Sequence, residues 1–173
     1  YDRVLVESVG IGQSEADISF AADSVILCIQ PGSGDSLQFM KAGVMELPDI
    51  VVVTKADMGE PARRAQADVE GALTLFDHDA DHWAAPVVLV SSTQGQGLPD
   101  LKAALEKHQS WLQDNNRLAR LRGAQEQAWA NEGIRTRFGS EGLALSRNIP
   151  VEAAGPFNRE RSIALELRQR FGA

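Results

Sequence analysis

Two short polar segments of the sequence could together recognise a guanine base. The first, Thr54-Lys55-Ala56-Asp57, ends the apolar run 50–54. The Asp57 carboxylate could accept hydrogen bonds from N1–H and the 2-amino group of guanine, a pair of donors that adenine lacks, while the Lys55 stem covers the base plane. The second, Ser91-Ser92-Thr93, follows the next apolar run and could present backbone N–H groups to guanine O6. Alone, the first segment is more typical of a helix-capping turn, but two such loops one strand-and-helix unit apart favour base recognition.

Residues near the start of the sequence could attend a terminal phosphate. Glu7 ends the apolar run 4–7, and its carboxylate could orient a water molecule or the shell of a Mg²⁺ ion. Gly10 would let its backbone N–H approach a γ-phosphate closely. A strand end followed by a glycine turn explains the same residues. The polar segment that contains Gln13 and Ser14 suits a switch loop.

The elements that would position these loops follow an alternating pattern. Four nearly continuous apolar runs predict strands covered on both faces, as in a parallel sheet, at Val4–Glu7, Ser24–Ile29, Ile50–Thr54 and Pro86–Val90. Helical patterns lie between them, one opened by the capping pair Asp35 and Gln38 and another by Pro61. The order βαβαβαβα predicts an α/β, doubly wound sheet with its ligand loops at the carboxyl ends of the strands.

Beyond the last strand the pattern becomes helical. Leucines from Leu98 to Leu112 predict a helix over about 99–131, with a weaker stretch at Asn115-Asn116. Glycines and Pro150 predict irregular structure from 133 to 155, followed by a last helix over 158–171. The expected domains are residues 1–115, the C-terminal part of a nucleotide-binding domain, and 116–173, a helical extension that could form a dimerisation arm.

Composition excludes several classes of function. The net charge of −7 argues against a nucleic-acid footprint or a basic membrane-binding patch on this chain, and no apolar run approaches the length of a membrane span. Cys28, the single cysteine, allows no intramolecular disulfide and fits a reducing cytoplasm; we expect it to be a buried strand residue. We expect His108 to be a packed histidine, and Trp83, Trp111 and Trp129 to pack or to lie at an interface.

The acidic run Asp77–His82 could resemble a metal site because His78 and His82 are four residues apart. The run lies in the connection before the fourth predicted strand, where Pro86 would end any helix. A solvated acidic loop is therefore the favoured interpretation.

Several of these motifs resemble the MeaB-like (ArgK, or LAO/AO) family of P-loop GTPases. Residues 6–15 resemble its "ETVGVGQSE" signature, Thr54–Asp57 its "NKAD" base motif and Ser91–Thr93 its "SAL"-type guanine loop. Residues 31–38, with Lys41, resemble an additional switch loop and its helix. The resemblance covers about residues 2–130. It implies the switch residues Gln13, Ser14, Asp35, Gln38 and Lys41.

The resemblance implies a function for the whole protein. Family members are GTPases that act as chaperones of cobalamin-dependent methylmalonyl-CoA mutase, and this implies GTP/GDP and Mg²⁺ as ligands, a mutase as partner and a homodimer. Thr54 replaces the family's usual Asn. No Gly-x-x-x-x-Gly-Lys-[Ser/Thr] motif occurs in the sequence, so we expect an N-terminally incomplete P-loop domain that is inactive alone. A nucleotide-free interaction protein and a nickel-insertion GTPase remain the alternatives.

Overall fold

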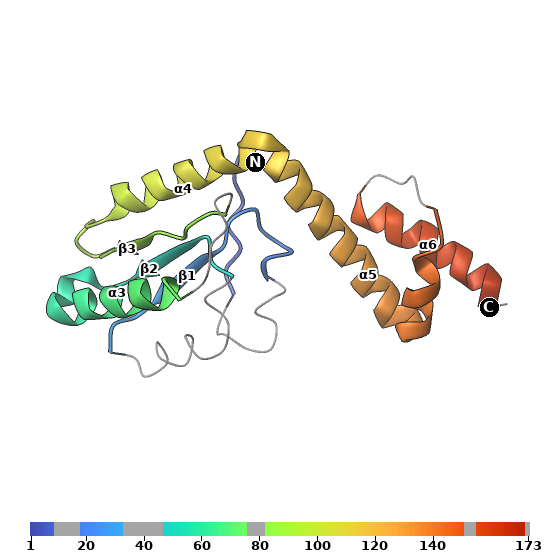
Figure 1. Ribbon diagram of the computed structural model, residues 1–173, viewed down its shortest axis with the longest axis horizontal. Helices are drawn as coiled ribbons and strands as arrows, with labels where there is room; N and C mark the ends of the chain where they lie inside the picture. Colours follow the sequence, from blue (N-terminus) through green and yellow to red (C-terminus); the bar gives the residue numbers. More distant parts are fainter. Residues whose placement is uncertain (9–17, 33–46, 76–81, 151–154, 172–173) are drawn as a thin grey trace. The chain divides into compact units, whose positions relative to one another are not determined.

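The computed structural model describes residues 1–8, 18–32, 47–75, 82–150 and 155–171. The chain divides into two compact units, Tyr1–Leu118 and Ala119–Ala173. The first contains the strands and the second is helical (Figure 1). The elements are the strands β1 (Ile26–Ile29), β2 (Ile50–Val53) and β3 (Val87–Leu89), the helices α3 (Glu60–Leu73), α4 (Leu98–Gln113), α5 (Arg117–Ser146) and α6 (Pro156–Phe171), and the 3₁₀ turns η2 (Ala56–Met58) and η3 (Asp114–Asn116).

The three strands form a parallel sheet in which β2 lies between β1 and β3. The register pairs Ile26 with Ile50 and Val51 with Val87. Each strand lies within one of the segments that the sequence predicts and is one or two residues shorter. The structure therefore confirms the parallel α/β sheet and three of its four predicted strands.

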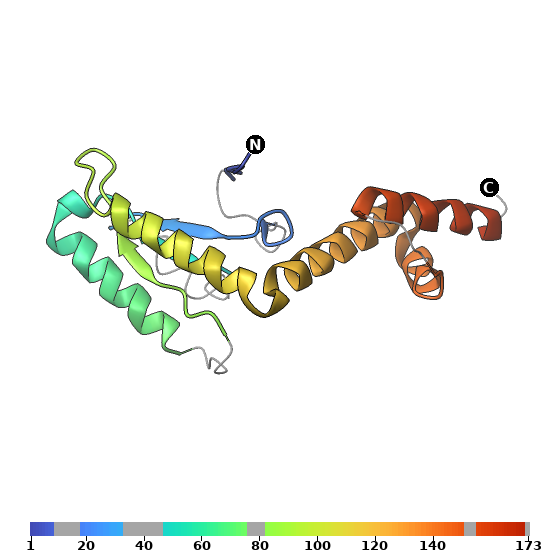
Figure 2. The same ribbon diagram turned by 90° about the horizontal axis from the view of Figure 1, so that it is seen from above.

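Helices cover both faces of this sheet. Successive side chains of a strand point to opposite faces, so Val51 packs with Val69 of α3, whereas Ile50 and Val52 pack with Ala104 of α4. Figures 1 and 2 show α3 and α4 on opposite sides of the strands. The four residues of β2 are at most 3% exposed. Burial on both faces explains why the strand sequences are continuously apolar rather than alternating.

The prediction of a strand at Val4–Glu7 is wrong for this structure. Residues 1–8 form no strand, and Val4, Leu5 and Val6 are 75%, 96% and 58% exposed. No described strand pairs with this segment. An extended segment without a partner leaves its N–H and C=O groups to water instead of to a hydrogen-bonded ladder, and is not stable as a strand.

The single helix predicted over 99–131 is broken at η3. Asn115 and Asn116 have φ values of 50° and 61°, in the left-handed region. Asparagine adopts this region more readily than most residues because its short polar side chain bonds locally. The weak stretch in the apolar pattern therefore marks two residues with a left-handed backbone conformation, and these separate α4 from α5.

The prediction of irregular structure over 133–155 is also wrong for most of that range. Helix α5 continues to Ser146, with a non-helical residue at Gly139. Ile134 of α5 packs in a buried cluster with Ile163 and Leu167 of α6. Burial of this apolar face outweighs the low helix propensity of glycine, about 1 kcal/mol per residue. Helix α6 agrees with the predicted last helix to within two residues at its start.

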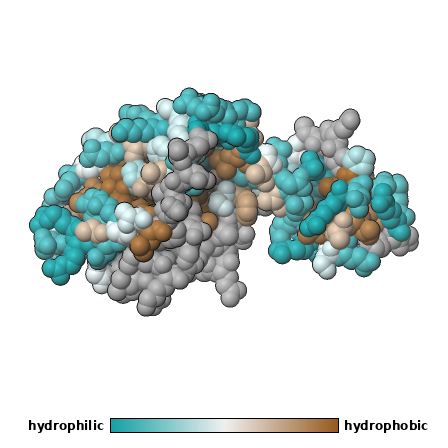
Figure 3. Space-filling view, viewed as in Figure 1, coloured by the Kyte–Doolittle hydropathy of each residue, from teal (hydrophilic) through white to brown (hydrophobic). Residues whose placement is uncertain are grey.

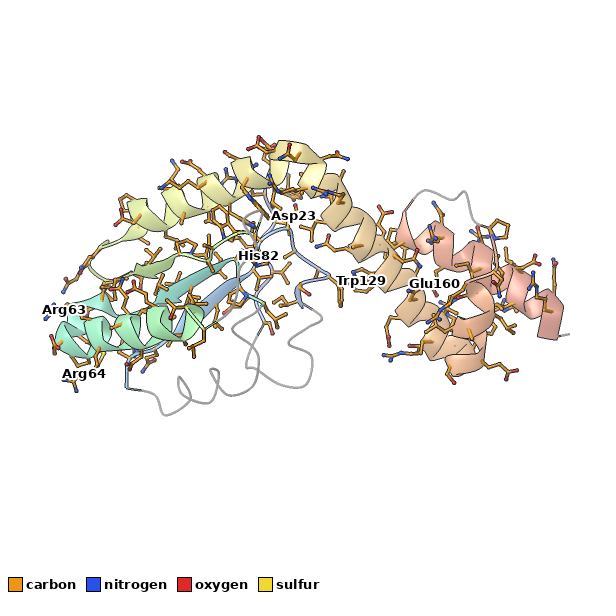
Figure 4. The ribbon with its side chains drawn as sticks, in the orientation of Figure 1. Asp23, Arg63, Arg64, His82, Trp129 and Glu160 are labelled. Carbon is orange, nitrogen blue, oxygen red and sulfur yellow. The ribbon has the colours of Figure 1, made fainter. Side chains whose placement is uncertain are left out.

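The helical unit contains a close contact between α5 and α6. A Cβ atom added at Gly133 would meet the carboxyl group of Glu160, labelled on α6 in Figure 4. The Glu160 carboxylate also lies 3.3 Å from Nε of Arg137 on α5. Brown apolar side chains show between the teal outer surfaces of these helices in Figure 3. Glycine at position 133 thus lets the two helices approach around an ion pair.

A buried polar cluster lies at the opposite end of the sheet from the predicted ligand loops. His108 is 1% exposed, its Nδ1 atom lies 2.8 Å from the Ser24 hydroxyl, and its ring contacts Trp83 and Trp111. Nε2 lies 3.3 Å from Asp49 Oδ1, at an angle that makes no hydrogen bond. The expectations of a packed histidine and of packing roles for Trp83 and Trp111 are confirmed. Trp129, by contrast, is 50% exposed.

Cys28 lies in β1, as predicted, but the expectation that it is buried is wrong. β1 is an outer strand of the described sheet, so the Cys28 side chain is exposed. Local desolvation nevertheless raises the pKa of its thiol, which favours the neutral form over a nucleophilic thiolate. Of the acidic run 77–82, only His82 is among the described residues, where it is exposed. Within the described residues no helix is long and apolar enough to cross a membrane.

Candidate nucleotide-binding site

The loop after β2 turns sharply between the other two strands. The Thr54 hydroxyl donates to the Ile29 carbonyl oxygen at the end of β1 (3.1 Å), and the Ala56 N–H donates to the Val90 carbonyl oxygen beyond β3 (3.1 Å). Between them, Lys55 has φ 53° and ψ 46°, a left-handed conformation that is uncommon for a residue with a side chain. The loop therefore leaves β2 in a fixed direction and leads into η2.

Asp57 is exposed on η2 and carries the perturbed carboxyl group of this loop. The Ser91 side chain lowers the pKa of Asp57 most, and the backbone N–H of Asp57 lowers it further; desolvation opposes them, and the positive charge of Lys55 adds the smallest effect. These interactions favour the charged carboxylate. Asp57 thus presents an ionised acceptor at the carboxyl edge of the sheet.

The loop after β3 supplies the partner of this carboxylate. Ser91 is 1% exposed, and its N–H donates to the Gln96 carbonyl oxygen at 3.0 Å. Its hydroxyl lies 3.0 Å from the Thr93 hydroxyl and accepts from the Gln94 N–H at 3.3 Å. The adjoining Ser92 and Thr93 are exposed. Because the Ser91 N–H is already paired within the loop, Ser91 acts here through its hydroxyl, and Ser92 and Thr93 form the part that a ligand can reach.

Gly97 fixes the return of this loop into α4. Its φ is 73°, and a Cβ atom at this position would clash with the backbone carbonyl of Leu89. Gly95 also has a positive φ, 68°, but nothing lies within 4 Å of its added Cβ. Only at Gly97 are both the conformation and the space restricted to glycine. The start of α4 therefore lies directly against β3, which places the Ser91 turn.

The structure brings one group of predicted residues together and leaves the others apart. Thr54, Lys55 and Asp57 join Ser91 and its neighbours at the ends of β2 and β3. Glu7 lies in the exposed N-terminal segment, and no described contact links it to these loops. The remaining predicted site residues lie outside the described residues; they are Gly10, Gln13, Ser14, Asp35, Gln38 and Lys41.

The described residues do not by themselves form a metal site. No group of three His, Cys, Asp or Glu side chains among them could hold an ion, and Glu7 is exposed without a second described carboxylate of the predicted site beside it.

Sequence reasoning missed the groups that support the two loops. The Ile29 carbonyl, which binds Thr54, and the Gln96 carbonyl, which binds the Ser91 N–H, are backbone atoms. Backbone acceptors of this kind leave no mark on residue type. The only available signal was the Gly95-Gln96-Gly97 turn, which indicates a tight return but not its partner.

The fold and the two loops at the carboxyl ends of β2 and β3 define an α/β, P-loop NTPase-type unit. A solved structure, described as "Crystal structure of LAO/AO transport system kinase", is similar to this chain with a TM-score of 0.65. The match covers 97% of this chain and 58% of that chain at 23% sequence identity, and it bears on the fold alone. The family model described as "Methylmalonyl Co-A mutase-associated GTPase MeaB" matches residues 1–143. The chain belongs to the MeaB family of GTPases.

Curated relatives agree with this assignment. The mouse protein "Methylmalonic aciduria type A homolog, mitochondrial" is 35% identical over 131 residues, 75% of this chain and 32% of its own length. The Caenorhabditis elegans protein of the same name is 33% identical over 131 residues, 75% and 33% of the respective lengths. The Caulobacter vibrioides protein named "Putative GTPase" is 34% identical over 140 residues, which are 80% of this chain and 43% of its own length. The chain thus spans about a third to under a half of these relatives.

Proposed function

We propose that the whole protein binds and hydrolyses GTP and that this chain supplies the guanine-reading part of its site. The observation that carries the proposal is the Asp57 carboxylate, whose pKa is lowered by Ser91 from the neighbouring loop and by Lys55. The two loops lie at the carboxyl edge of a parallel sheet, where ligands bind in folds of this class. Membership of a GTPase family supports the same proposal.

In this proposal Asp57 determines the choice of base. Its ionised carboxylate accepts from N1–H and the 2-amino group of guanine, and adenine would leave this charge without donors. The Lys55 stem covers the base plane, and the exposed Ser92 and Thr93 lie where the O6 side of the base would enter. A buried hydrogen bond to a charged group contributes about 1.5–3 kcal/mol, which corresponds to roughly 10–150-fold in affinity.

The phosphate side of the proposed site rests on the family resemblance. Glu7 and Gly10 would attend the γ-phosphate and the shell of Mg²⁺, and the loop 31–38 would respond to the nucleotide state. No Gly-x-x-x-x-Gly-Lys-[Ser/Thr] sequence occurs among the 173 residues. Without such a backbone cradle and lysine the β- and γ-phosphates are not held, so we propose that this chain alone does not hydrolyse GTP.

The proposed partner is a cobalamin-dependent acyl-CoA mutase, and the proposed role is that of its chaperone in the cytoplasm. The family description names methylmalonyl-CoA mutase. If residues 31–41 relay nucleotide state, Asp35→Ala and Lys41→Ala should leave basal hydrolysis within about 3-fold but reduce its stimulation by the mutase about 5–150-fold. Equal stimulation of the wild type and both variants would remove this loop from the coupling.

The helical unit is proposed to form a homodimer. Its surface exposes the large apolar side chains of Trp129, Phe157 and Leu165, which are 50%, 75% and 53% exposed. Exposed apolar side chains on a small helical unit favour association with a second surface. The test belongs with the predictions below.

Titration calorimetry with the whole protein tests the nucleotide assignment. We expect GTP to bind at least about 10-fold more tightly than ATP. Asp57→Asn should weaken GTP binding and improve binding of xanthosine triphosphate, because an amide can donate to the additional xanthine oxygen. Asp68→Asn, at an exposed position on α3, is the matched control and should change neither affinity. An unchanged nucleotide preference in Asp57→Asn would show that this residue only caps a helix.

A further inference from the structure

The base-reading loop is attached to β1 through both the backbone and the side chain of Thr54. The Thr54 N–H and the Thr54 hydroxyl both donate to the Ile29 carbonyl oxygen, at 2.8 and 3.1 Å. Ile29 is 1% exposed, so water has little access to compete for this acceptor. The hydroxyl is therefore committed to the sheet, and it faces a backbone atom of β1.

The same loop is attached to the other side of the sheet two residues later. The Ala56 N–H donates to the Val90 carbonyl oxygen, while Lys55, between the two attachments, has a left-handed backbone. Such a conformation costs on the order of 1 kcal/mol or more for a residue with a side chain and persists where its surroundings fix it. The bonds at Thr54 and Ala56 hold Lys55 from both sides.

The direction of the chain after Lys55 decides where the Asp57 carboxylate lies. Asp57 follows Ala56 in η2, and the Ser91 side chain on the loop after β3 lowers its pKa. A loop without the hydroxyl bond keeps its backbone bonds to Ile29 and Val90 but loses the constraint on the side chain of its first residue. The carboxylate would then occupy a wider range of positions relative to a base.

We propose that Thr54 is a positioning residue whose hydroxyl, bound to β1, sets the discrimination of guanine by Asp57 without contacting the base. The inference rests on the proposed function and gives Thr54 a part in it. In this chain the brace is a hydroxyl on a backbone carbonyl. Discrimination through the 2-amino group should therefore depend on a hydroxyl at position 54.

The test compares GDP with IDP, whose base lacks the 2-amino group, in the whole protein. Thr54→Val keeps the side-chain shape and removes the hydroxyl, so the ratio of GDP to IDP affinity should fall about 2–10-fold, as for one hydrogen bond. Thr54→Ser keeps the hydroxyl and should restore the ratio to within about 2-fold. The ratio is informative because a lower folded fraction weakens both nucleotides equally.

Thr74→Val is the matched control. The Thr74 hydroxyl also donates to a backbone carbonyl, that of Gly71, at 2.7 Å, but at the exposed end of α3. The ratio should not change in this variant. If Thr54→Val does not fold, Thr54→Ala takes its place with the same expected ratio.

Two failures can be told apart. A wild-type ratio above one that remains unchanged in Thr54→Val overturns the positioning role and leaves the proposed function intact. A wild-type protein that binds GDP, IDP and ADP equally overturns both. A fall in the ratio that Thr54→Ser fails to restore shows that the methyl packing, and not the hydroxyl, is responsible, and this also overturns the inference.

Discussion

Gly97→Ala should destabilise the first unit far more than Gly95→Ala, although both glycines lie in one turn and both have positive φ. A side chain in the left-handed region costs roughly 1–2 kcal/mol at either position. At Gly97 the new Cβ atom would also clash with the Leu89 carbonyl, a backbone group of β3 that cannot swing away. Forced overpacking adds about 1–3 kcal/mol. The free energy of unfolding should therefore fall by about 2–5 kcal/mol for Gly97→Ala and by about 1–2 kcal/mol for Gly95→Ala.

Urea unfolding followed by tryptophan fluorescence measures this difference. Trp83 and Trp111 lie in the first unit and Trp129 in the second, so a Trp129→Phe background makes the signal report the first unit alone. The Gly97→Ala variant should also lose guanine discrimination, because the Ser91 turn rests on the same contact. If the two variants unfold within about 0.5 kcal/mol of each other, a difference typical of neutral surface changes, the close approach of α4 to β3 is refuted.

Three further predictions concern other parts of the chain. Ser91→Ala should raise the pKa of Asp57 towards its ordinary value, and carboxyl ¹³C NMR can follow this titration. In the wild type the pKa of Asp57 is lower in the folded than in the unfolded protein. The stability that this difference contributes is therefore present at pH values above the unfolded pKa and is lost as the pH falls through the folded pKa. An unchanged titration would show that Ser91 does not hold the carboxylate. His108→Ala should lower the free energy of unfolding in urea by about 2–4 kcal/mol, since it leaves a cavity and unpaired polar neighbours. Lys107→Ala, at an exposed position, should change this free energy by no more than about 0.5 kcal/mol. Equal effects of the two substitutions would contradict a structural role for His108. A chain ending at Asn116 should sediment as a monomer and the longer chain as a dimer, and identical oligomeric states would rule out the helical unit as the interface.

Much of the fold could be predicted because the buried strands carry a strong local signal. Ile50 to Val53 form a continuous apolar run, and both of their faces are covered. Pro61 and Gly59 likewise mark the start of α3. The failures arise where nonlocal contacts decide. Val4–Glu7 has the composition of a strand but no described partner, and α5 extends over four glycines because Ile134 is buried against α6.

The candidate site shows the same division. The residue types of Asp57 and Ser91 indicate a carboxylate and a hydroxyl on adjacent loops, and in the structure the Ser91 side chain lowers the pKa of Asp57. The support for these loops comes from the backbone carbonyls of Ile29, Val90 and Gln96. Every residue has such a carbonyl, so only the path of the chain shows which ones are used.

Because of the cluster around His108, the two ends of the sheet should differ in local stability. Ser24 lies just before β1 and Asp49 just before β2, and the Trp83 indole N–H donates to the Asp49 carbonyl (2.7 Å). The amino ends of the strands are thus held together by partly or fully buried side chains, while the carboxyl ends lead into exposed loops. Local unfolding of the sheet should begin at these loops and proceed towards the amino ends of the strands. Amide hydrogen exchange should accordingly be faster at Ser92, in the exposed loop after β3, than at Val25, whose N–H is held by the Asp49 carboxylate at 2.8 Å.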